Sequence, residues 1–179
     1  MEDPFKVGAE TAEGMVTGGR NGGLYMPPWK LREMMKGVQD KKSEEYQRMT
    51  WEALKKAING LVNKMNVANL KSIVLELFGE NIIRGRALLV RSLMKAQMAS
   101  PAFTHVYAAL LAVVNTKMPE VGELLLSRVL HQFRRAFKRN DKMACVAVTK
   151  FLAHLVNQQV AHELTALQLI TLLLEAPTD

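Results

Sequence analysis

The chain has 179 residues, of which 49% are hydrophobic and 23% charged, a composition that predicts one folded domain and excludes a wholly disordered chain. Its one cysteine, Cys145, excludes an internal disulfide and a multi-cysteine zinc site. The longest apolar run, residues 106–114, is too short to cross a membrane, and no apolar segment follows Met1. We therefore expect a soluble intracellular domain that has no secretory signal and no membrane partner.

The net charge of +7 is unevenly distributed along the chain. Residues 1–23 carry −2, residues 24–127 carry +6, residues 128–150 carry +6 and residues 151–179 carry −3. The density of positive charge is therefore highest in one short window. A local basic patch on a folded domain indicates a docking surface, whereas a uniform polycation would indicate a nucleic-acid tail.

The first 42 residues differ in composition from the rest. Residues 1–23 hold six of the eleven glycines and few apolar side chains, which predicts a flexible lead-in. In residues 24–42, Pro27 and Pro28 favour an extended backbone with aromatic side chains on either side. We interpret this segment as a strap that anchors onto the domain and leads into a short helix after Trp29.

From residue 43 onward, apolar residues recur at intervals of three and four, which is typical of amphipathic helices. Ser100 and Pro101 are a capping residue and a first-turn proline, Pro119 opens another helix, and Asp141 can cap the next. No alternating pattern indicates a strand. We predict helices at 43–63, 69–79, 82–99, 101–116, 119–139, 141–157 and 160–175.

The spacing of these helices predicts the fold. Taken as antiparallel pairs, they begin at residues 43, 82 and 119, a period close to the roughly 40 residues of HEAT and armadillo repeats. We therefore expect an all-α solenoid of about three helical hairpins plus a further helix, over residues 43–179. The seventh helix has no partner, so we expect the solenoid to be truncated at its C-terminal end.

No constellation of residues indicates catalysis, a metal or a cofactor. The four histidines fall on different predicted helices and form no metal-binding pair with ligand spacing. Cys145 lies on an apolar helix, where we interpret it as a small buried residue. There is no phosphate-binding glycine loop and no nucleophile elbow. We expect a chain that is not an enzyme and has no catalytic residue, resident metal or cofactor.

The densest basic run lies at the end of the helix predicted at 119–139. Helical spacing turns Phe133 and Phe137 toward the core, and some basic residues in a last turn are explained by the helix dipole. RNA binding would gain from exposed aromatic side chains, so we favour a solvated or protein-binding surface over an RNA-binding one. The candidate RNA-facing residues are Arg134, Arg135 and Lys138, with Arg139 beside them.

Gly60 lies inside the first long helix, where a glycine costs about 1 kcal/mol relative to alanine. The cost is explained by a tolerated surface position, by a tight contact between helices, or by the close approach of a partner to bare backbone. Hairpin geometry places the turns within repeats on one edge of the solenoid. The candidate partner-binding residues on that edge are Gly60, Asn63, Lys64, Arg139, Asn140 and Asp141.

Several longer strings resemble one family. They are YQRM at 46–49, WEALKK at 51–56, INGL at 58–61, ENIIRGR at 80–86, SPAFTHVYAA at 100–109 and RNDK at 139–142. The chain resembles the nucampholin-type pre-mRNA splicing factors, in the domain related to the middle domain of translation initiation factor 4G. The likeness runs from about residue 22 to residue 179, and residues 1–21 show none.

The resemblance implies a function that the residues alone do not give. Family members bind the DEAD-box ATPase at the core of the exon junction complex, hold its two lobes apart and bring it to the spliceosome in the nucleus. On that basis Gly60, Asn63 and Lys64 are expected to contact the carboxy-terminal lobe of the ATPase. The resemblance implies further helices after the one that ends at Glu175 and a second domain, so we expect this sequence to match only part of such a protein. The alternative from a different class is an RNA-binding helical-repeat module that uses the basic run.

Overall fold

The computed structural model describes residues 27, 29, 30, 33 and 42–175, and the chain divides into two compact units, 1–53 and 54–179. The predicted lead-in at 1–23 lies outside the described residues. So does most of the predicted strap at 24–42, of which Trp29 and Lys30 are described and helical.

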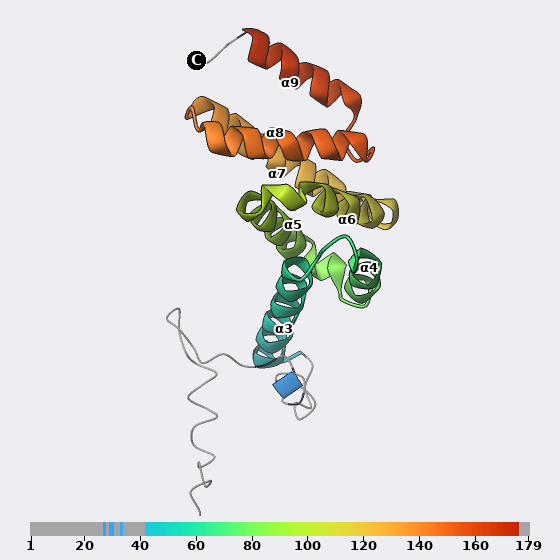
Figure 1. Cartoon of the computed structure of the whole chain (residues 1–179). Coiled ribbons are helices and arrows are strands. Elements are labelled where there is room, and N and C mark those ends of the chain that lie inside the picture. The colour runs from blue at the N-terminus through green and yellow to red at the C-terminus, as the bar shows by residue number, and fades with distance from the viewer. Residues whose placement is uncertain (1–26, 28, 31–32, 34–41, 176–179) are drawn as a thin grey trace, which may run out of the picture. The chain divides into compact units, whose positions relative to one another are not determined.

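Residues 42–175 form helices joined by short connections, without a strand in this part of the chain (Figure 1). The all-α solenoid of three pairs plus a further helix is confirmed. The pairs are α3 (Glu44–Asn63) with α4 (Leu70–Phe78), α5 (Ile82–Ala99) with η1 (Pro101–Phe103) and α6 (Thr104–Lys117), and α7 (Pro119–Lys138) with α8 (Lys142–Asn157), followed by α9 (Glu163–Glu175). The first helices of the pairs begin at 44, 82 and 119, close to the predicted starts.

The core of the second unit runs along the stack between the paired helices. Its largest fully buried apolar side chains include Ile58 on α3, Leu77 on α4, Leu125 on α7 and Phe151 on α8. Burying a side chain of this size contributes about 1.5–3 kcal/mol, so the stack is held mainly by apolar contacts. These join successive helices such as α7 and α8, and also helices one apart such as α5 and α7. This explains why the 3.6-residue period in the sequence predicted the helices well.

A buried polar contact ties three helices together. Gln97 of α5 is 1% exposed, and its Nε2 donates to the carbonyl oxygen of Ala147 on α8 at 2.9 Å and to Oγ1 of Thr104 on α6 at 3.2 Å. Thr104 Oγ1 donates in turn to the carbonyl oxygen of Pro101 at 2.6 Å. Because a buried amide is costly without partners, this set of bonds fixes the second pair on the third.

Two helix starts differ from the predictions. Ser100 was expected to cap a helix at 101, but its side chain makes no cap hydrogen bond and the chain first forms the 3₁₀ turn η1. The amide of Phe103 donates to the backbone carbonyl oxygen of Ser100 at 3.1 Å, so the donor that a serine cap would bind is already used. The α-helix therefore starts at Thr104.

The last helix begins at Glu163 rather than at residue 160. The preceding residues close α8, since Gln159 has φ 57° and the amide of Val160 donates to the carbonyl oxygen of Leu155. This is a Schellman motif, which cannot continue directly into a helix. Nδ1 of His162 then accepts from the amide of Leu164 at 3.1 Å and so caps the first turn of α9.

Among the described residues, no single helix has both the length and the apolar composition of a membrane span. Residues Ile82–Ala99 and Pro101–Lys117 reach that length and composition only as a joined pair, across a bend of 117°. α9 packs against α8 and has no buried residue. Its exposed apolar side chains are Leu164, Leu167, Ile170, Leu172 and Leu174.

Candidate partner-binding surface

The surface around Gly60 is open. Gly60 is exposed near the end of α3, and a Cβ built on it would have no atom within 4 Å. A tight contact between helices therefore does not explain this glycine. Such a contact occurs instead at Gly85 of α5, where a Cβ would lie 2.7 Å from Cδ1 of Ile58. What remains at Gly60 is a patch of bare helix backbone, which a tolerated surface glycine and a partner that approaches closely would both explain.

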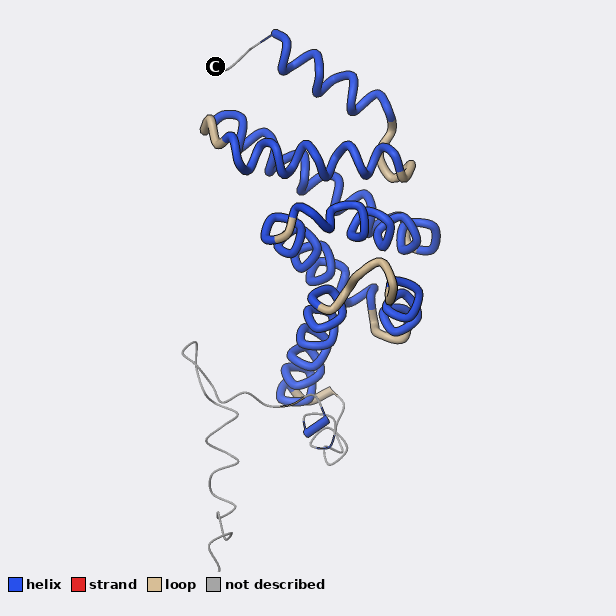
Figure 2. The backbone as a smooth tube through the Cα atoms, viewed as in Figure 1, coloured by secondary structure: helices blue, strands red, loops and turns tan. Residues whose placement is uncertain are grey.

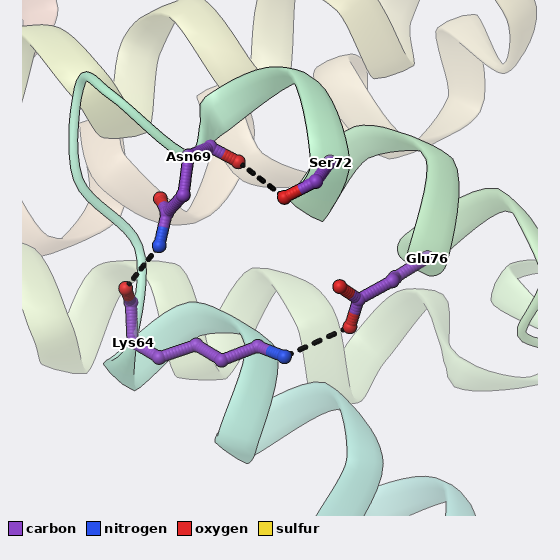
Figure 3. A network of polar contacts seen from close by, with 4 residues as sticks. All are labelled: Lys64, Asn69, Ser72 and Glu76. Carbon is purple, nitrogen blue, oxygen red and sulfur yellow. Dashed lines mark hydrogen bonds and ion pairs between the residues drawn. The ribbon is translucent and has the colours of Figure 1, made fainter.

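Lys64 follows one turn later, and its side chain is held by α4. Its Nζ lies 2.8 Å from Oε2 of Glu76, and the two side chains are 53% and 50% exposed. Its carbonyl oxygen accepts from Nδ2 of Asn69 at 2.8 Å (Figure 3). The backbone amides of Asn66 and Asn69 each donate to the side-chain oxygen of the other residue. Oγ of Ser72 donates to the carbonyl oxygen of Asn69, which adds α4 to the same network (Figure 3).

This network positions Lys64 before any partner arrives. An ion pair between half-exposed side chains contributes only about 0–1 kcal/mol, so a partner carboxylate can join or replace Glu76 at little cost. The pairing depends on the approach of α4 to the residue that follows α3, and sequence reasoning did not find it. Asn63, the last residue of α3, is exposed beside it.

The second candidate segment, Arg139 to Asp141, forms the connection between α7 and α8, and part of it has a structural role. Asn140 has φ 53°, and its amide donates to the carbonyl oxygen of Phe137 while that of Asp141 donates to the carbonyl oxygen of Ala136. This is a Schellman motif that ends α7 with asparagine in the left-handed position. Asp141 Oδ1 accepts from the amide of Ala144 at 3.0 Å, which confirms the predicted cap of α8.

The basic residues of α7 do not share one surface. Phe133 is 2% exposed and Phe137 is half-buried and stacks on it at 5.9 Å between ring centroids, as the helical spacing predicted. Arg134, Arg135 and Lys138 are exposed. Arg134 lines a cavity of about 380 Å³ next to α9, whereas Arg135 lines a groove of about 600 Å³ next to α5. The basic run in the sequence is thus divided between two sides of α7.

Arg139 and Asp141 line the same groove as Arg135. Two further arginines line it that were not among the predicted site residues, Arg91 on α5 and Arg128 on α7. A signal for them existed, because residues 128, 135 and 139 are seven and four apart and so share one helix face. Only the packing of α5 against α7 brings Arg91 to that face.

The connections α5/η1 and α7/α8 lie on one side of the stack, and α6/α7 and α8/α9 lie on the other (Figure 2). The α3/α4 connection with Lys64 belongs to the first pair, two pairs away from α7/α8. A partner that touched Lys64 and Arg139 together would therefore extend along the stack from the first pair to the third.

The chemistry of the remaining polar side chains is limited. Cys145, predicted to be buried, is only partly so. The rings of His105 and His154 lie 6.3 Å apart, and burial, His105 and Lys150 together lower the pKa of His154. No group of three or more metal-ligating side chains occurs in the described part of the chain. The surfaces around Lys64 and Arg139 can bind through backbone, charge and hydrogen bonds.

Comparison with known proteins identifies the family. Residues 55–179 match the model of the MIF4G domain. The chain belongs to the MIF4G-domain family. The match begins within α3 and covers every later helix of the stack, so Gly60 and the α7/α8 connection both lie inside the MIF4G domain.

The chain is similar to one group of curated proteins. It is 63% identical over 160 residues to the pre-mRNA-splicing factor cwc22 of Aspergillus fumigatus, which covers 89% of this chain and 18% of that protein. It is 58% identical over 160 residues to the pre-mRNA-splicing factor CWC22 homolog of Homo sapiens, and this match also covers 89% of this chain and 18% of that protein. The resemblance found in the sequence strings is confirmed.

A third relative corrects one detail. The CWC22 homolog of Danio rerio is 55% identical over 178 residues, which covers 99% of this chain and 18% of that protein. The likeness therefore extends into the first 21 residues, where the sequence strings had shown none. The chain spans less than a fifth of the length of these relatives.

Proposed function

We propose that this MIF4G domain acts in pre-mRNA splicing as an adaptor rather than an enzyme. It binds the DEAD-box ATPase of the exon junction complex, holds it open and inactive, and delivers it to the spliceosome in the nucleus, where other spliceosome proteins contact it. The relatives are named as splicing factors, which supports the role in splicing. The partner comes from the family resemblance, and the residues around Gly60 carry its assignment to this surface.

The observation that supports this most is bare backbone next to a positioned cation. A Cβ at Gly60 would meet nothing within the chain, so the glycine has no internal steric reason. Lys64 is held at 2.8 Å from Glu76 one turn away. A partner helix or loop can lie directly on the backbone at Gly60 and present a carboxylate or carbonyl oxygen to Lys64 and Asn63.

Inhibition follows from differential binding. A DEAD-box ATPase is active when its two lobes close on ATP and RNA, so a ligand that binds only the open arrangement shifts the population away from the active one. A stack of helices with a continuous core is a rigid surface for this purpose. The proposed contacts at the first and third helical pairs are apart along the stack, which suits a partner held in an extended arrangement.

The first test varies the size of the side chain at position 60. Gly60→Ala and Gly60→Tyr both fit the open space in the free domain, so both should keep the helical circular-dichroism signal. We expect capture of the purified ATPase to fall with Gly60→Ala and to be lost with Gly60→Tyr. Unchanged capture by Gly60→Tyr would contradict the proposal and leave Gly60 as a tolerated surface glycine.

The second test separates contact with the partner from the network within the chain. Asn63→Asp combined with Lys64→Glu should abolish capture, because it places carboxylates where the partner meets an amide and an ammonium. Glu76→Gln removes the same internal ion pair but leaves Lys64 positive, so it should preserve capture. Equal loss in both variants would mean that the α3/α4 network, and not charge toward a partner, is responsible.

Nucleotide and RNA provide the third readout. Capture should be strongest without them and should fall when an ATP analogue and RNA together close the ATPase.

Direct RNA binding remains the second candidate, through Arg134, Arg135, Lys138 and Arg139. It predicts RNA affinity of the isolated chain that falls steeply with salt and less steeply after these charges are removed. Because the structure divides Arg134 from Arg135 between two sides of α7, a continuous RNA path has less support.

A further inference from the structure

A groove of about 600 Å³ lies between α5, α7 and the start of α8, away from the Gly60 surface. Its apolar part is formed by Met94 and Met98 of α5 with Ala136 and Ala144. Around this part lie four arginines and a few other polar side chains. The polar lining residues are Arg91, Arg128, His131, Gln132, Arg135, Arg139 and Asp141.

The positive charge in this groove is not neutralised within the described chain. Arg91, Arg135 and Arg139 are exposed and form no ion pair with a carboxylate in residues 42–175. Arg128 is half-buried and donates from Nη1 to the carbonyl oxygen of Ala87 at 3.3 Å, which holds its side chain toward α5. The one acid of the lining, Asp141, accepts the capping hydrogen bond from Ala144.

The arginines are arranged in rows along the groove. Arg128 and Arg135 lie on one face of α7, and Arg139, the residue that follows this helix, continues the row at intervals of seven and four residues. Arg91, Met94 and Met98 lie on one face of α5 at intervals of three and four. Eleven residues of α-helix span about 16 Å, the length of about five residues of extended chain. The groove is thus long enough for a short linear segment.

We propose that this groove binds an acidic linear segment of a partner protein that carries an apolar side chain between carboxylates. Arginine pairs with carboxylates through two parallel hydrogen bonds, and methionines adapt to apolar side chains of different shape. Charge complementarity selects the acidic residues, and the methionine floor takes the apolar one. A nucleic-acid strand would match the charge but would leave this floor unused, and His131 is the one aromatic ring among the lining residues on which a base could stack.

This site does not depend on the proposed function. Arg139 and Asp141 are shared with the candidate ATPase surface, but Arg91 and Arg135 are not among its proposed contacts. An assay that contains the chain and a peptide, without the ATPase, therefore tests the groove separately. A failure here would leave capture of the ATPase through Gly60 and Lys64 unaffected.

The probe is a fluorescein-labelled peptide in which one leucine is flanked by glutamates, with glycine and serine at its ends. Binding to the full 179-residue chain is followed by fluorescence anisotropy. Peptides with the glutamates changed to glutamine, or with the leucine changed to serine, should bind at least about tenfold more weakly, since tenfold corresponds to about 1.4 kcal/mol. Equal binding by either control peptide would overturn the proposal.

Variants of the chain locate the binding. Arg91→Glu and Arg135→Glu should each weaken the peptide by about tenfold or more, while Arg134→Glu should have little effect because it faces the cavity next to α9. These side chains are exposed, so circular dichroism should show the same helix content in all three. An equal loss in Arg134→Glu would show attraction to charge alone and overturn the proposal. So would no peptide binding at low salt, or tighter binding of a labelled oligouridine through Arg91 and Arg135.

Discussion

The first and third helical pairs differ in whether their basic side chains are paired with a carboxylate. At the α3/α4 connection, Lys64 is paired with Glu76 at 2.8 Å and lies beside bare backbone at Gly60. In the groove along α7, Arg135 and Arg139 have no carboxylate partner within the described residues. The ion pair holds the Lys64 side chain in one orientation and has almost no net charge. It therefore suits a partner that is recognised mainly by its shape. Unpaired arginines around an apolar floor suit a ligand that brings its own negative charge.

The largest effect on the free energy of unfolding should come from removing Phe133, the buried side chain of α7 next to Arg134 and Arg135. Phe133→Ala deletes a side chain that is 2% exposed, so it should lower the free energy of unfolding by about 3–5 kcal/mol. Phe137→Ala, at a half-buried position, should cost clearly less. Urea denaturation measures both. Equal costs would mean that the orientation of α7 does not depend on Phe133.

The next effect concerns the connection that carries Arg139. Asn140 has φ 53°, so Asn140→Ala should lower the free energy of unfolding by about 1–2 kcal/mol. Asn140→Gly should not destabilise the domain, because glycine adopts this conformation freely. Gln159, with φ 57° at the end of α8, is the matched position, and Gln159→Gly should stabilise. Thermal unfolding compares the three, and a stable Asn140→Ala would contradict the role of this conformation.

A smaller effect, in the opposite direction, is expected at the first pair. Gly60→Ala should raise the free energy of unfolding by about 1 kcal/mol, because alanine favours helix and nothing opposes its Cβ. The same variant is expected to weaken capture of the ATPase, so stability and binding should change in opposite senses. If denaturant titrations showed that Gly60→Ala lowers the free energy of unfolding, the surface at Gly60 could not be open, and this prediction would be wrong.

The ion pair itself should matter little for stability. Glu76→Gln removes the partner of Lys64 at half-exposed positions and should cost about 0–1 kcal/mol, with the difference vanishing at high salt. Stability measured at low and high salt checks this. A large cost that salt does not change would show that the Lys64 network supports the fold and is more than a device for positioning the side chain.

The smallest effect concerns His154, where the surroundings disfavour a positive charge. Burial lowers its pKa below the usual 6.5, and His105 and Lys150 lower it further. The unfolded chain therefore takes up a proton at a higher pH than the folded one. The contribution of neutral His154 to the free energy of unfolding should be complete above about pH 6.5. It should decline as the pH falls from there toward the lower native pKa. His154→Gln should flatten this decline, and unfolding measured at several pH values checks it.

Local signals in the sequence located most helix boundaries, and errors arose where backbone bonds competed with side chains. Asp141 was predicted to cap α8 and does so. Ser100 was predicted to cap in the same way but does not, since the amide of Phe103 is used by a 3₁₀ turn. The late start of α9 follows from the left-handed conformation of Gln159, a residue type that gives no local sign of it.

For the candidate sites too, local spacing predicted some features and not others. Spacing along α7 alone turned Phe133 inward and left Arg134 and Arg135 exposed, as observed. It did not reveal that the two arginines line different cavities, because this depends on which helix packs on each side of α7. The pairing of Lys64 with Glu76 likewise joins the residue that follows α3 to a residue of α4, and no local pattern encodes that contact.

The amino-acid sequence by itself determined the all-α repeat, its period, and the MIF4G family, because helical periodicity, capping residues and family strings are local properties of the chain. Only the tertiary structure decided that Gly60 faces open space, that Lys64 is held by α4, and that Arg91 joins Arg135 around an apolar groove. These properties depend on the distances between atoms of different helices, which are set when the apolar faces pack and not by any single segment.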